Sequence, residues 1–165
     1  MNDALLTLMS YQLWADSEFL DKLELLDKKK NSVEYEAGLR LMDHINVVAR
    51  IFSAHLSREN HGFLSDKTIP TPALAELRAS IEQTDRWYLD YVQSLSQDEL
   101  RERISFAFTD GDKGSMSRGE MLMHVVLHGA VHRGEIGRIL SQIGADLPWD
   151  TLAVFLHSSE PARRR

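Results

Sequence analysis

Four long segments, in which apolar residues recur with the period of an α-helix, place the strongest constraint on the fold of this chain. They cover roughly residues 4–28, 33–59, 71–95 and 117–144. A helix that is apolar along one face has to bury that face against a neighbouring element. Because the chain carries little strand pattern besides these segments, we expect an all-α fold, an antiparallel four-helix bundle.

Local signals mark where two of these helices begin and end. Thr71-Pro72 combines a capping hydroxyl with a proline at the first helical position, which predicts the start of the third helix. Ser117 and Glu120 have the spacing of a capping box, which predicts the start of the fourth. Gly144 follows that helix and is expected to end it.

The parts of the chain outside the four segments are short. Bulky apolar and small residues alternate over 104–108, which predicts an extended segment, and residues 110–114 are expected to turn the chain. Residues 147–157 are predicted to form a short extra C-terminal helix that packs Trp149 and Phe155 on the body.

The length of 165 residues suits one domain. We expect a single domain over residues 1–158, followed by a basic C-terminal tail, residues 159–165, that ends in three arginines.

The fourth segment contains the stretch HVVLHGAVHRGEIGRIL, with histidines at positions 124, 128 and 132. His128 and His132 fall on the apolar face of this segment, in line with Val125 and Ile136. A buried imidazole needs a hydrogen-bond partner or a metal ion, because its desolvation is otherwise unfavourable. One such histidine is more often a satisfied core residue, but two on adjacent turns favour a shared ion.

The three histidines cannot all bind one ion. His124 and His132 are eight residues apart, which is roughly 12 Å along a helix axis, whereas zinc–nitrogen bonds are only about 2.1 Å. The pair is therefore His124 with His128 or His128 with His132, and spacing alone leaves both open.

A third ligand has to come from another helix, and the second segment offers His44 and His55. Because they are about 16 Å apart along that helix, only one can serve. His44 lies beside the apolar stripe near mid-helix, so the pattern favours it over His55, which lies near the helix end. His61 and His157 are predicted to be surface residues.

Composition excludes several classes of function. The formal net charge of −6 argues against a nucleic-acid partner, because such partners select clustered lysine and arginine. There are no cysteines, so disulfides and thiolate nucleophiles are excluded. We see no signal peptide and no apolar run long enough to cross a membrane, and we therefore expect a cytoplasmic protein without a membrane partner. Gly129 stands where the zinc-protease motif His-Glu-x-x-His has glutamate, so a hydrolase of that type is unsupported.

The chain resembles the DinB family (DinB/YfiT-like proteins) in four segments that occur in the family's order. The most specific is the His-x-x-x-His-Arg-Gly pattern of the last helix. The matching stretches are YQLWAD at 11–16, DHINVVARIF at 43–52, HGAVHRGEIGRIL at 128–140 and LPWDTLAVFL at 147–156.

This resemblance implies an antiparallel four-helix bundle with up-down-down-up order, often a homodimer, that holds a divalent metal ion through three histidines. Carried over by matching segment, the metal ligands are His44, His128 and His132, and His124 becomes a neighbour of the site. Glu135 stands where the family commonly has glutamine, and we interpret it as a salt-bridge or hydrogen-bond partner that steadies the helix.

The resemblance also implies a function. Some relatives are thiol-dependent transferases or isomerases that use low-molecular-weight thiols, so we expect a metal-dependent enzyme of the thiol-transferase or hydrolase type that acts on a small-molecule substrate. Zn or Ni is the expected ion, although three histidines also accept other divalent metals. No catalytic residue is assigned. Arg133 either orients an anionic group or makes a structural salt bridge, and the second interpretation is favoured.

A rival interpretation is a non-catalytic, stress-related bundle that binds a metal or ligand and acts through assembly. The sequence does not identify the substrate.

Overall fold

The computed structural model of this chain describes residues 2–164, which are mostly helical. In chain order the elements are α1 (Asn2–Glu24), α2 (Ser32–Ser57), α3 (Leu74–Ser94), α4 (Gln97–Arg101), β1 (Arg103–Ala107), β2 (Lys113–Ser117), α5 (Arg118–Gln142), α6 (Leu152–Ser159) and the 3₁₀ turn η1 (Pro161–Arg163). The predicted mainly helical class is confirmed, and the four long helices coincide with the four periodic segments.

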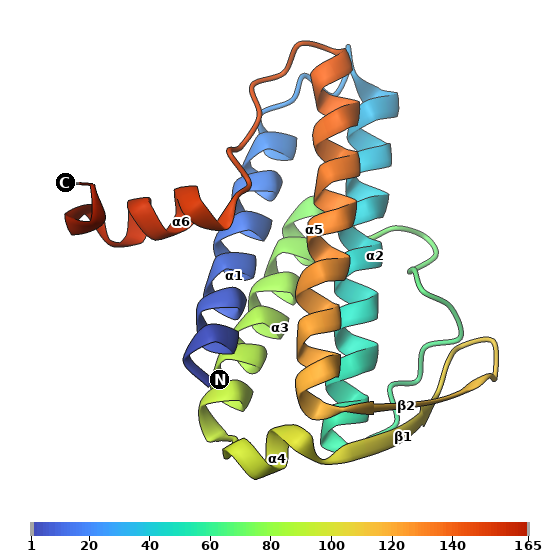
Figure 1. Cartoon of the computed structure of the whole chain (residues 1–165). Coiled ribbons are helices and arrows are strands. Elements are labelled where there is room, and N and C mark those ends of the chain that lie inside the picture. The colour runs from blue at the N-terminus through green and yellow to red at the C-terminus, as the bar shows by residue number, and fades with distance from the viewer. Residues whose placement is uncertain (1, 165) are drawn as a thin grey trace.

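The four long helices lie side by side, as Figure 1 shows. α1 and α5 run in one direction, and α2 and α3 run in the other. Each of α1 and α2 contacts both α3 and α5. The connection 58–73 runs from the end of α2 back along the molecule to the start of α3, so that α2 and α3 can be parallel (Figure 1).

Buried apolar side chains from all four long helices fill the space between them. Toward the end of the molecule where α1 finishes they include Leu23, Met42, Ile81 and Ile136. Toward the opposite end the core is richer in aromatic residues, and it includes Phe52, Tyr88, Phe106 and Met121. Each such side chain contributes about 1.5–3 kcal/mol of hydrophobic stabilisation, which fixes the positions of the helices relative to one another.

The start and end predicted for α5 are correct. The Ser117 side chain accepts from the Glu120 N–H, and the Glu120 carboxylate accepts from the Ser117 N–H. At the other end Gly144 takes a left-handed φ of +69°, and the N–H of Ala145 donates to the carbonyl of Leu140. This glycine-terminated arrangement satisfies carbonyls that the last turn would otherwise leave free.

The start predicted for α3 is wrong. The helix begins at Leu74, its N-cap is Ala73, and no side chain caps it. The chain before it is held against α2, where the N–H of Thr68 donates to the buried Asp43 carboxylate over 2.7 Å. Thr71 and Pro72 therefore belong to this anchored connection.

The strands β1 and β2 form a small antiparallel hairpin, so the fold is not strictly all-α. Ile104 pairs with Met116, and Phe106 pairs with Gly114. A Cβ on Gly114 would lie 2.6 Å from the Phe106 ring, so this close approach requires glycine. The extended segment and the turn after it were predicted, but the second strand and the short helix α4 were not.

The short C-terminal helix α6 is present as predicted, but it projects from α1 with none of its residues buried (Figure 1). Phe155 packs on Tyr11 and Trp14 of α1, with ring centroids 6.1 and 5.7 Å apart. Trp149 is 78% exposed, so the prediction that it packs on the body is wrong. Among residues 2–164, no helix combines the length and apolar character needed to cross a membrane.

Candidate metal centre

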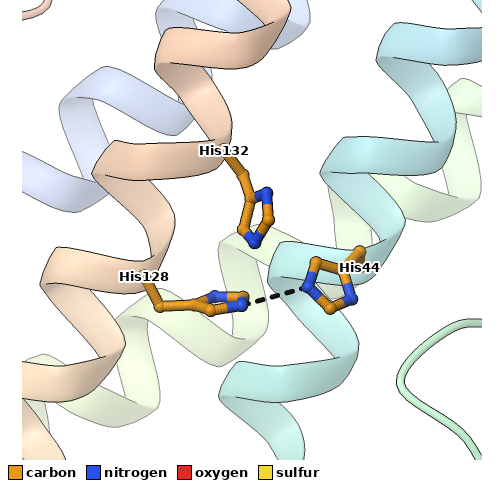
Figure 2. Close-up of side chains that lie close together, drawn as sticks. All are labelled: His44, His128 and His132. Atoms are coloured by element: carbon orange, nitrogen blue, oxygen red, sulfur yellow. Dashed lines mark hydrogen bonds between the residues drawn. The ribbon is translucent and has the colours of Figure 1, made fainter.

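Three histidines from two helices converge between α2 and α5 (Figure 2). His44 comes from α2, while His128 and His132 come from successive turns of α5. Each offers one ring nitrogen, these nitrogens all lie within 4.8 Å of one another, and all three residues are partly buried. The structure therefore brings together the three residues that the resemblance implied as ligands.

A backbone carbonyl fixes the tautomer of His44. Nδ1 of His44 lies 2.8 Å from the carbonyl oxygen of Asp66, in the connection between α2 and α3. A carbonyl only accepts hydrogen bonds, so Nδ1 carries the proton and donates it. Nε2 of His44 is then the unprotonated nitrogen, and it points toward the other two histidines (Figure 2).

A carboxylate fixes the tautomer of His132 in the same way. Nδ1 of His132 lies 3.0 Å from Oε2 of Glu135, one turn further along α5. An ionised carboxylate only accepts, which leaves the lone pair of the neutral imidazole on Nε2. Outer partners of this kind are typical of metal-binding histidines, whose orientation and basicity they fix.

His128 lies between the other two rings. Its Nε2 is 3.0 Å from Nε2 of His44, and its ring centroid is 4.5 Å from that of His132. Burial, together with the neighbouring imidazoles of His132 and His44, lowers the pKa of His128 to about 3. The ring is therefore neutral near pH 7, which is the form that binds metal ions.

This donor set fits a divalent ion. Metal–nitrogen bonds of about 2.1 Å place the ligand nitrogens of one ion roughly 3–4 Å apart, which is close to the spacing of the three histidines. Three neutral imidazoles suit Zn and Ni. An ion held by these three histidines alone would keep a further coordination position for a small molecule, as ions in catalytic rather than structural sites do.

Two neighbouring residues of α2 hold the connection between α2 and α3 beside the three histidines. The His44 imidazole donates to the carbonyl of Asp66, and the Asp43 carboxylate accepts from the N–H of Thr68. The connection is thereby fixed beside the histidines. Sequence reasoning did not identify Asp66, because the contact is made by its backbone carbonyl, a group that every residue type carries.

A pocket of about 220 Å³ adjoins the centre and shares His44 and His128 with it. His124 and His55 line the pocket without joining the three-histidine group, and burial lowers the pKa of both. His124 is thus a neighbour of the centre, as the resemblance implied. The ring of His61 meets that of His55 edge to face, with ring centroids 5.3 Å apart, and His61 is partly buried.

Arg133, next to His132 in the chain, points away from the centre and is fully buried. Its guanidinium pairs with Asp16 of α1 at 2.8 Å and with Asp150, just before α6, at 2.9 Å. Burial raises the pKa of Asp16, and the positive charge of Arg133 opposes that rise. Arg133 therefore makes the structural ion pair that was favoured, and it is not placed to orient a substrate at the histidines.

Comparison with known proteins identifies the family of this chain. The family model described as the DinB family matches residues 1–164. Protein DinB of Bacillus subtilis (strain 168) is 25% identical over 180 aligned residues, which cover 98% of this chain and all of that protein. The chain belongs to the DinB family.

Proposed function

We propose that this protein binds one divalent metal ion through His44, His128 and His132, and that it is a metal-dependent enzyme of the thiol-transferase or hydrolase type. The observation that carries the proposal is the convergence of three ring nitrogens within 4.8 Å of one another. A divalent ion at this position supplies Lewis acidity, which activates water or stabilises a thiolate. Zn or Ni is the ion we expect.

Hydrogen-bond acceptors of the protein orient two of the three proposed ligands. The Asp66 carbonyl and the Glu135 carboxylate hold Nδ1–H of His44 and His132, so both Nε2 lone pairs are directed at one point. The four long helices form the rigid support, and we propose that they constitute the up-down-down-up four-helix bundle of the family. The adjoining pocket offers space for a small-molecule substrate.

Elemental analysis of untagged protein tests the first part of this proposal. We expect about one equivalent of metal in the wild type and in His61→Ala, and a large loss in His128→Ala. His61→Ala is the matched control because it removes a partly buried imidazole outside the three-histidine group. Equally low metal content in the wild type and in His128→Ala would show that the site is not a metal centre.

A screen of small thiols and electrophiles with metal-loaded protein tests the second part. We expect turnover that the wild type shows and His128→Ala lacks. Full metal content with persistent inactivity, and with no exchangeable water on the ion, would identify the protein as a binding module instead.

We further propose that the protein is a homodimer. Met123, Leu127 and Val131 are 45%, 66% and 62% exposed and follow one another at four-residue intervals on α5, so they form an apolar stripe on its outer face. A second copy could cover this stripe. Sedimentation at micromolar concentration should show a dimer that Leu127→Glu weakens and that Leu64→Glu, at the 96% exposed Leu64, does not. A monomeric wild type would overturn the proposal.

A further inference from the structure

The pocket beside the three histidines has a composition that selects its ligand. It lies on the side of the centre formed by His44 and His128, so a molecule that fills it lies within reach of the three-histidine centre. Its walls come from α2, from the connection between α2 and α3, from α5, and from β1 with the turn that follows it. The inference below rests on the function proposed above.

The walls are mainly aromatic and aliphatic. The apolar lining residues are Val48, Ile51, Phe52, Phe106 and Phe108. The aromatic rings contact one another, since the centroids of Phe52 and Phe106 are 5.8 Å apart and those of Phe106 and Phe108 are 4.9 Å apart. The imidazole of His124 lies against Phe52 at 4.6 Å, and that of His55 against Phe106 at 5.0 Å. A flat apolar group fits walls of this kind.

The charges at the pocket also favour an apolar ligand. Among the described residues that line it there is no lysine or arginine, and the one acidic residue is Asp66. A carboxylate, sulfonate or phosphate in the pocket would lose water without gaining a cation, and it would lie near a carboxylate of the same sign. The pocket therefore disfavours a ligand with anionic groups other than the atom that reaches the histidines.

The volume of the pocket is enough for one aromatic ring. An apolar cavity of about 150 Å³ admits benzene. The pocket, at about 220 Å³, therefore has room for one ring with a short substituent. Phe108, which is 48% exposed, lies at the solvent side of this space.

We propose that this pocket is the binding site for a compact, singly anionic ligand with an aromatic ring, which lies against Phe52, Phe106 and Phe108 while its thiolate or similar donor atom reaches the metal centre. Thiol cosubstrates with several carboxylates would find no cation among the residues that line this pocket.

Two thiols that differ only beyond the second carbon test this proposal. We choose 2-phenylethanethiol and 2-mercaptoethanesulfonate, and we measure their binding to cobalt-loaded full-length protein from the thiolate-to-cobalt absorption. We expect the phenyl compound to bind about tenfold tighter or more. Equal binding, or tighter binding of the sulfonate, would overturn the proposal.

Two variants sharpen this test. Phe108→Ala should weaken 2-phenylethanethiol by about threefold or more and leave the sulfonate unchanged, whereas Leu64→Ala, at an exposed position outside the pocket, should change neither. Thr109→Arg places a cation at an exposed pocket residue and should strengthen the sulfonate selectively. An unchanged affinity for both thiols in Phe108→Ala would contradict the proposed position of the aromatic ring.

A second measurement separates failure of this proposal from failure of the metal centre. Val48 and Ile51 line the pocket, and the NMR signals of their methyl groups report on a bound ring whether or not cobalt is present. Methyl shifts with 2-phenylethanethiol in a protein that takes up no cobalt would support the pocket and reject the metal function. Cobalt uptake with no methyl shift would reject the pocket proposal alone.

Discussion

Glu135 accepts a hydrogen bond from His132 across one turn of α5, with 3.0 Å between the carboxylate oxygen Oε2 and the ring nitrogen Nδ1. The carboxylate holds His132 in the tautomer whose Nε2 faces His44 and His128. Its role is therefore more specific than the helix-steadying one expected from the sequence, because it orients a proposed metal ligand.

Removal of this carboxylate should weaken metal binding. We expect Glu135→Ala to lower zinc affinity by roughly 10- to 100-fold, as measured by competition with a chromophoric chelator, because the His132 ring loses its orienting partner. Glu36→Ala removes an exposed carboxylate from α2 and is the matched control. Unchanged affinity in Glu135→Ala would show that packing alone orients His132.

Acidification should destabilise the metal-free protein in a defined pH range. The pKa of His128 is about 3 in the folded protein because of burial and the neighbouring imidazoles. In the unfolded chain the pKa of a histidine is about 6.5. Between these values the unfolded state binds a proton that the folded state does not, so the free energy of unfolding falls as the pH drops below about 6.5.

Denaturant unfolding of chelator-treated protein checks this prediction. We expect a loss on the order of 1 kcal/mol between pH 7 and pH 4.5, a modest value because solvent reaches part of the ring. His128→Gln should show a smaller loss over the same range, since glutamine does not titrate. The same pH dependence in both proteins would assign the effect to other groups.

The buried ion pair between Arg133 and Asp16 should contribute strongly to stability. Arg133→Met leaves the fully buried Asp16 carboxylate without its partner, and we expect a decrease of about 3–5 kcal/mol in the free energy of unfolding. Arg101→Ala, which breaks the exposed pair with Asp98, should change it by less than about 1 kcal/mol.

A double-variant cycle tests whether Arg133 and Asp16 act together. Asp16→Asn combined with Arg133→Met should destabilise less than the sum of the two single changes, because the second substitution removes the charge that the first one leaves alone. Additive losses would mean that the two side chains stabilise the fold independently.

Periodicity and spacing predicted most of the fold and part of the site. The four helical segments follow from local pattern, and so does His128 as a member of either possible histidine pair, because each depends on residues a few positions apart. The pattern only favoured His44 over His55, and the family resemblance settled both that choice and the choice of His132 over His124. Both choices depend on how α2 and α5 pack, which periodicity leaves open.

Asp16 illustrates what local pattern cannot show. In the first segment it interrupts an apolar stripe, and the structure explains this by a partner 117 residues later in the chain, Arg133. The hairpin wall of the pocket, with Phe106 and Phe108, is another tertiary feature of this kind. The predicted start of α3 was wrong for a related reason. The hydrogen bond from the Thr68 N–H to the Asp43 carboxylate holds the connection against α2, and the helix begins only at Leu74, after the predicted start at Thr71-Pro72.

Gly129, on the turn between His128 and Arg133, should resist substitution although it lies inside a helix. A Cβ at Gly129 would lie 3.0 Å from Nη1 of Arg133, and the two carboxylates that hold the guanidinium prevent it from moving aside. A Cβ at Gly137 of the same helix would meet only the Phe19 ring, at an ordinary 3.9 Å. In thermal or denaturant unfolding we therefore expect Gly137→Ala to stabilise the protein by about 0.5–1 kcal/mol, through its higher helix propensity, and Gly129→Ala to destabilise it. If Gly129→Ala also stabilises the protein, the guanidinium has room to shift, and the close packing of Arg133 does not require glycine at this position.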